Sequence, residues 1–193
     1  MLRRLYDWTM GLAAHRSAPW ALAGVSFAES SVFPIPPDVM LIPMVLAKRL
    51  KAWFYATIAT VSSVLGGVLG YVIGYFLFET VGIPILRFYG YTEAFADFAQ
   101  RYNDYGAWIV FFAGVTPFPY KVITIASGAT KLNFLVFLMA SIAARGLRFF
   151  VVTALLYWFG PPIKDFIEKR LGLMFTLFVI LLFGGFVLVR YVL

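Results

Sequence analysis

Five ionisable side chains lie inside apolar stretches of this sequence, where charged groups are costly. They are Glu29, Asp38, Lys121, Arg145 and Arg148. On insertion scales, each costs about 2.5 to 3.5 kcal/mol when it faces lipid at a helix centre, so we expect these side chains to face inward and to pair. Three of them are positive and two are negative, which leaves one positive charge. A site with this charge suits an anion.

The two arginines are the strongest candidates for binding a phosphate group. Arg145 and Arg148 are three residues apart, so on a helix they project from one face. A guanidinium presents its N–H groups as a fork that matches phosphate oxygens. Lys121, Thr116 and Tyr120 lie beside a proline break and could add a cation and two hydroxyls. The alternative is that the charges pair only with one another and hold helices together, or that Arg148 extends toward the membrane surface.

Glu29 and Asp38 are the expected anionic partners of this basic cluster. Without an anionic ligand they would neutralise the cluster, and an acid that loses its cation to a ligand takes up a proton more easily. We expect Glu29 to couple ligand binding to proton uptake because it lies within an apolar arm. We expect Asp38 to contribute mainly to the assembly of the surrounding segments.

The composition indicates an integral membrane protein. Of the 193 residues, 62% are hydrophobic and 13% are charged, which is far from the composition of soluble domains. The apolar stretches are too many and too long for a signal peptide. The sequence has no cysteine and one histidine, His15, so disulfides, thiolate ligands and histidine-based metal centres are not expected. We expect no enzyme activity, no cofactor and no metal.

Three apolar stretches are long enough to span a bilayer, which takes about 20 residues. They are residues 52–78, 134–160 and 173–193. In the first of them Gly66, Gly70 and Gly74 recur every fourth residue. A row of glycines on one helix face predicts close helix packing.

Two other apolar stretches are broken by prolines. The breaks contain Pro34, Pro36 and Pro37 in residues 20–47, and Pro117 and Pro119 in residues 107–130. Proline lacks a backbone donor and restricts the preceding residue, so neither stretch continues as one helix. Each arm is too short for a hydrocarbon core of about 30 Å. Two short arms around a break predict a re-entrant hairpin, whose backbone must be surrounded by protein or by a water-filled cavity.

The hairpin and the long helix occur twice. When the sequence is shifted by 83 positions, residues 32–48 match residues 115–131 at six of 17 positions. If each unit has one crossing helix and one non-crossing hairpin, successive units enter from opposite sides of the bilayer, which predicts an inverted repeat. The predicted fold class is therefore an all-α integral membrane protein, an inverted repeat of a re-entrant hairpin plus a transmembrane helix, with an additional C-terminal transmembrane helix.

We expect one membrane domain over residues 1–193. Its parts are an N-terminal interfacial segment (1–17), a first hairpin-plus-helix repeat (18–78), an amphipathic connector (79–106), a second repeat (107–160) and a C-terminal helix (173–193). The connector could lie at the interface or merely cover the end of the bundle. If the hairpins are re-entrant, nine basic residues lie on one side and four on the other. This asymmetry predicts a cytoplasmic N-terminus.

The stretches ESSVFPIPPDVMLIP, SVLGGVLGYVIGY and GVTPFPYKVITIASG resemble the bacterial DedA family, also described as the VTT-domain or SNARE-associated Golgi protein family, and most closely its YqaA-type members. The resemblance covers residues 20–160 and implies two opposed re-entrant hairpins, a multi-pass protein of the bacterial inner membrane and movement of lipids between leaflets. It also implies that Glu29 and Asp38 are the family's acidic pair and that Lys121 replaces a usual arginine. Many members carry two arginines around the second proline break, but residues 114–116 contain none.

Together these features predict a flippase- or scramblase-type translocator of a lipid with an anionic phosphate headgroup, such as undecaprenyl phosphate or a phospholipid. Membrane lipids are the expected partners, and a homo-oligomer is compatible with the sequence. The net charge of +7 is attributed to topology and anionic lipid, not to nucleic acid. The alternatives are a proton-coupled small-solute transporter, an assembly scaffold, and a lipid phosphatase or other intramembrane enzyme. The enzyme is disfavoured because no histidine nucleophile accompanies the basic residues.

Overall fold

A computed structural model describes residues 17–31, 36–116 and 118–169 of the chain. Within these ranges the regular secondary structure is entirely helical, so the predicted all-helical class is confirmed there. The predicted C-terminal helix (173–193), almost all of the N-terminal interfacial segment (1–17), Pro34 and Pro117 lie outside the described residues.

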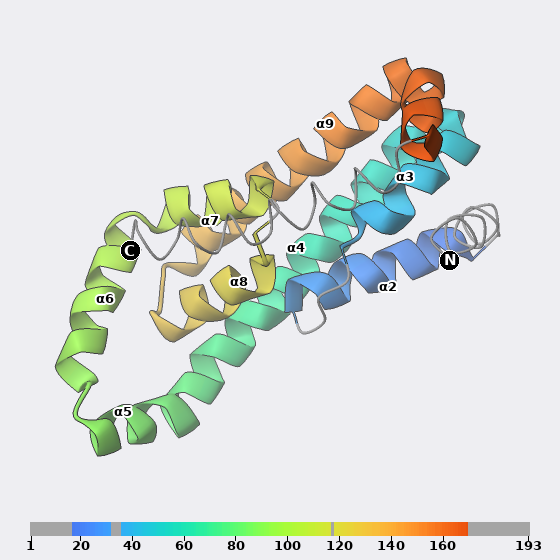
Figure 1. Cartoon of the computed structure of the whole chain (residues 1–193). Helices are drawn as coiled ribbons and strands as arrows, with labels where there is room; N and C mark the ends of the chain where they lie inside the picture. The colour runs from blue at the N-terminus through green and yellow to red at the C-terminus, as the bar shows by residue number, and fades with distance from the viewer. Residues whose placement is uncertain (1–16, 32–35, 117, 170–193) are drawn as a thin grey trace.

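The described part of the chain contains two long helices and several short ones (Figure 1). The elements are α2 (Ala18–Ser31), α3 (Asp38–Ala47), η1 (Arg49–Lys51), α4 (Ala52–Leu77), η2 (Phe78–Gly82), α5 (Ile83–Tyr89), α6 (Thr92–Asp104), α7 (Gly106–Val115), α8 (Tyr120–Ala129) and α9 (Phe134–Lys169).

Among the described residues, two helical runs are long and apolar enough to cross a membrane. The first is Arg49–Tyr89, which contains α4, and the second is Phe134–Gly160 within α9. The first run extends past residue 78 because a π-helical turn, η2, leads directly into α5. The second continues past residue 160 after a kink at Phe159 (φ −112°, ψ 16°). Two prolines follow this kink, and a new helical turn tolerates proline because its first N–H groups need no partner.

The short helices form two pairs, α2 with α3 and α7 with α8, each divided by a proline-containing break. Figure 1 shows that α3 and α8 run back from the directions of α2 and α7, and that the helix ends beside both breaks lie near the middle of α4 and α9. Pro37 and Pro119 occupy the N-cap positions of α3 and α8. The four helices have 14, 10, 10 and 10 residues. At 1.5 Å per residue, each is only about 15 to 21 Å long.

The first half of the fold (residues 18–78) and the second half (residues 107–160) pack so that each long helix contacts a short helix of the other half. The α4 helix packs against α2 from its own half and α8 from the other, whereas α9 packs against α7 from its own half and α3 from the other. The α4 and α9 helices also contact each other. This exchange brings the two breaks to the same region of the molecule.

Glycines permit the closest of these contacts. A Cβ at Gly66 would overlap the Phe27 carbonyl of α2, and one at Gly74 would overlap the Ile125 carbonyl of α8. From the opposite side, a Cβ at Gly128 would overlap the Tyr71 carbonyl of α4. The backbone of α4 therefore touches the backbones of α2 and α8, which no larger residue at these positions would allow.

The connector helix α6 is attached to the end of α8. The hydroxyls of Tyr102 and Ser127 are 3.0 Å apart, and the Asn103 side-chain amide donates to the Thr130 carbonyl at 2.8 Å. Burial raises the pKa of Tyr102 to about 12, so its phenol stays protonated and can serve as a hydrogen-bond donor. These contacts hold α6 against the second half of the fold.

The glycine contacts lead to a stability prediction. Gly74→Ala should lower the free energy of unfolding by about 1 to 3 kcal/mol, because the methyl group overpacks the α4–α8 interface. Gly24→Ala is a matched control, since a Cβ there meets nothing within 4 Å, and it should leave stability unchanged or slightly raised. Thermal unfolding in detergent compares the variants. Equal stability of Gly74→Ala and wild type would contradict this packing.

Candidate functional site

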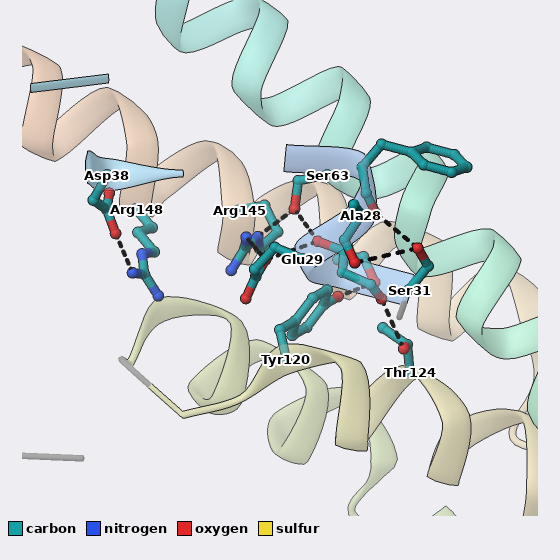
Figure 2. Close-up of polar contacts among 12 residues, drawn as sticks. Ala28, Glu29, Ser31, Asp38, Ser63, Tyr120, Thr124, Arg145 and Arg148 are labelled. Atoms are coloured by element: carbon teal, nitrogen blue, oxygen red, sulfur yellow. Dashed lines mark hydrogen bonds and ion pairs between the residues drawn. The ribbon is translucent and has the colours of Figure 1, made fainter. Parts of the chain in front are cut away.

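Two ion pairs connect the first break to the middle of α9 (Figure 2). The Nη2 atom of Arg145 lies 2.6 Å from Oε2 of Glu29, near the end of α2. The Nη2 atom of Arg148 contacts Oδ2 of Asp38, the first residue of α3. Glu29 before the break and Asp38 after it thus form ion pairs with the two arginines of the apolar helix α9.

The Glu29–Arg145 pair is completed by two serines. Nε of Arg145 donates to the Ser63 hydroxyl at 2.5 Å, the Ser63 and Ser30 hydroxyls are 2.7 Å apart, and Ser30 donates to Oε2 of Glu29 at 3.1 Å. Because Ser63 accepts from the arginine, its own proton can point to Ser30, whose proton points to Glu29. The four side chains then form a closed ring in which each hydroxyl donates once and accepts once.

Two aromatic rings enclose the Arg145 guanidinium. Its central carbon lies 4.8 Å from the ring centroids of both Tyr120 and Phe149, a geometry that favours a cation. The Tyr120 hydroxyl donates to Ser141 at 2.5 Å. Arg145 has an exposed fraction of 0%. Tyr120 therefore contacts the buried arginine here, and its predicted contact with a substrate stays a prediction.

The Arg148–Asp38 pair is accessible, unlike the first pair. The side chains of Arg148 and Asp38 are 16% and 22% exposed. Nη1 of Arg148 also donates to the Thr116 carbonyl at 2.8 Å, which attaches the end of α7 to α9. The Thr116 hydroxyl donates to the Ala113 carbonyl at 3.3 Å. The two arginines thus bind separate acids in this arrangement, and their joint binding of a phosphate stays a prediction.

The helix that follows the second break, α8, also contacts this cluster. The Thr124 hydroxyl lies 3.1 Å from the Ser30 carbonyl and 2.9 Å from the Lys121 carbonyl, and it can donate to either. Lys121 itself is partly exposed near the start of α8. A Cβ at Gly70 would overlap the Thr124 side chain, so this glycine leaves room for the contact. The cluster consequently contains side chains from α2, α3, α4, α8 and α9.

Ser63 and Ser30 were not identified from the sequence as site residues. Their only signal was a hydroxyl in an apolar segment, and such hydroxyls commonly bond to the backbone of their own helix. Among the described residues, no group of three or more His, Asp or Glu side chains could hold a metal ion. The cluster is therefore a charged hydrogen-bonding site without a metal-ligand set in the part of the chain that the structure describes.

Comparisons with known proteins identify relatives of the chain. The family described as VTT domain matches residues 35–158. A protein of Haemophilus influenzae, described as uncharacterized, is 35% identical over 170 residues, which is 88% of both chains. A protein of Histophilus somni with a similar description is 42% identical over 165 residues, 86% of this chain and 84% of that one. No solved structure matches the chain significantly.

The unequal burial of the two ion pairs predicts unequal effects on stability. Glu29→Gln should lower the free energy of unfolding by about 3 to 5 kcal/mol, because it leaves the buried Arg145 cation without its anion. Asp38→Asn is the matched control at the accessible pair and should cost about 1 kcal/mol or less. Unfolding of both variants is measured in the same detergent. An equal or larger loss for Asp38→Asn would disprove this ranking.

Proposed function

Because the chain belongs to the VTT-domain (DedA) family, whose members act in membrane transport, we propose that it is a lipid translocator. Its substrate is a lipid with an anionic phosphate headgroup, such as undecaprenyl phosphate or a phospholipid, which it moves between leaflets of the bacterial inner membrane. The observation that carries this proposal is the cluster of two arginines at the middle of α9, where residues of α2, α3 and α8 that flank the breaks come together.

In this proposal α4 and α9 cross the bilayer, and the two pairs of short helices are re-entrant hairpins of an inverted repeat. Exposed tryptophans near the ends of the long helices support this placement. Trp53 contacts Tyr157 beside Trp158 at one end, and Trp108 lies with Val136 near the start of α9 at the other, as in the aromatic belts of membrane proteins. The arginine cluster then lies near the bilayer midplane, where an irregular backbone must be enclosed by protein or line a water-filled cavity.

The accessible pair is the first contact for the headgroup. A phosphate that reaches Arg148 competes with Asp38 for the same guanidinium, and charge-assisted hydrogen bonds to phosphate are strong enough to compete. Lys121 adds positive charge near the second break. The Glu29–Arg145 pair is sealed, so the headgroup reaches it only when α2 separates from α9. Such a movement would carry the headgroup past the midplane while its tail remains in lipid.

An apolar groove near the start of α9 fits a lipid better than it fits a small polar solute. This open groove of about 310 Å³ between α7 and α9 contains no residue of the cluster and is lined by Ala107, Trp108, Phe111, Val136, Met139 and Ala140. An apolar lining offers no polar contacts to a soluble substrate but accommodates hydrocarbon. This observation favours lipid translocation over solute transport and over a scaffold, which needs no such cluster.

Removal of accessible cations tests the proposal. Arg148→Ala and Lys121→Ala should each slow the exchange of a labelled anionic phospholipid in proteoliposomes by about tenfold to a hundredfold, because a charged hydrogen bond contributes about 1.5 to 3 kcal/mol. Arg87→Ala, at the exposed end of α5, is the control and should exchange lipid at the wild-type rate. If both cluster variants fold and exchange lipid normally, the arginine cluster is structural.

Proton coupling through Glu29 gives a second test. When a phosphate replaces Glu29 at Arg145, the carboxylate loses its cation and binds a proton more readily. The exchange rate of the wild type should therefore change with pH, and that of the folded fraction of Glu29→Gln should not. Exchange is measured from mildly acidic to alkaline pH for both proteins. A flat wild-type profile would leave Glu29 as a structural ion-pair partner.

A further inference from the structure

Two buried polar atoms of the cluster have no hydrogen-bond partner among the described residues. They are Nη1 of Arg145 and Oδ1 of Asp38. The first is a donor on a cation, and the second is an acceptor on an anion. Native proteins leave few buried polar atoms unpaired, and those that remain often mark places where a ligand or water binds. Both atoms belong to residues that the proposed function uses, so they bear on what the site binds.

The two atoms belong to neighbouring groups. Arg145 lies one helical turn before Arg148, so the side chains lie on the same side of α9. The charges of Asp38 and Arg148 both act on the Arg145 guanidinium. Figure 2 shows Arg145 between the Glu29 and Ser63 contacts on one side and the Arg148–Asp38 pair on the other. A group that enters between the two ion pairs when α2 separates therefore meets a free donor and a free acceptor.

Among the described residues, Oδ1 of Asp38 is the carboxylate oxygen of the cluster that is both buried and without a hydrogen-bond partner. Oε2 of Glu29 already accepts from Arg145 and Ser30, and Glu29 is the less exposed acid, at 13% against 22% for Asp38. Asp38 uses only Oδ2 toward Arg148. Asp38 is thus the acid that can contact the part of a headgroup beyond its phosphate.

We propose that Asp38 makes the site selective for headgroups that carry a hydrogen-bond donor next to the phosphate. The phosphate accepts from Arg145 and Arg148, and an ammonium or hydroxyl group of the same headgroup donates to Oδ1 of Asp38. Phosphoethanolamine and phosphoglycerol meet this requirement, whereas phosphocholine has no N–H or O–H to donate. This inference rests on the proposed function and narrows its substrates to phospholipids with such a headgroup, which excludes undecaprenyl phosphate.

A site with a buried acceptor rejects an analogue that lacks the donor, because the acceptor is then left unpaired. Wild-type protein should therefore exchange phosphatidylethanolamine at least about tenfold faster than phosphatidylcholine in proteoliposomes. The label is placed on the acyl chain so that the headgroup amine stays intact. In a series with zero, one, two and three N-methyl groups, the rate should fall in one step, at the third methyl group, when the last N–H is lost. A gradual decline would indicate discrimination by size and would overturn the inference.

Variants of the acid identify the selecting residue. Asp38→Leu should bring the ratio of the two rates close to one, and Asp38→Asn, which keeps an acceptor oxygen, should retain most of the preference. Glu79→Ala is the control, because Glu79 pairs with Lys131 outside the cluster, and its ratio should equal that of the wild type. If Asp38→Leu does not fold, the methylation series on the wild type still tests whether the site requires a headgroup N–H.

The outcomes separate this inference from the proposed function. Exchange of both lipids at equal rates by the wild type would overturn the selectivity and leave lipid translocation intact. Exchange of neither these lipids nor other phosphate-headgroup lipids would overturn the proposed function and the selectivity with it.

Discussion

The burial of one cation, Arg145, determines how the helices of this protein are arranged. An ion that is removed from water costs several kcal/mol unless a counter-ion and hydrogen-bond acceptors surround it. No single helix supplies all of these, so α2 contributes Glu29, α4 contributes Ser63, and α8 contributes Tyr120. The α2 and α8 helices are short because the chain ends or turns near the arginine, whereas the long helix α4 passes it. The proline breaks and the buried charges therefore both serve to surround Arg145 with a counter-ion and hydrogen-bond acceptors.

The glycines of α4 also help to surround Arg145, because they let α2 and α8 pack closely against α4. Short side chains such as serine and threonine reach the cluster only if their helices approach α4 closely. Gly66 permits this approach for α2, and Gly70 and Gly74 permit it for α8. Leucine at these positions would hold the helices several ångströms apart, beyond the reach of Ser30 and Thr124. The close packing of α4 thus determines the geometry of the ionic contacts as well as stability.

The sequence predicted which charged residues form this site, but not which of them pair with one another. Apolar stretches, prolines and buried charges identified an all-helical protein with broken segments and acids near arginines. They did not identify which acid meets which arginine, because that depends on how far each helix is rotated in the packed structure. Ser63 was not predicted as a site residue, because a serine hydroxyl in an apolar helix usually forms a hydrogen bond with the backbone of its own helix. The predicted span over residues 134–160 is found in α9, whereas the helical continuation to Lys169 was not predicted, because two prolines follow residue 160 and the helix is kinked at Phe159.

The two ion pairs differ in a way that fixes the order of events in any opening of the cluster. Arg148 and Asp38 are partly exposed and lie at the edge, so they can exchange partners without movement of a helix. Arg145 is sealed by the ring that contains Ser30, and the backbone carbonyl of Ser30 also faces the Thr124 hydroxyl of α8. A displacement of α2 that exposes Arg145 therefore breaks its contact with α8 as well. Opening the sealed pair loosens both halves of the fold together, whereas opening the outer pair loosens only the first break.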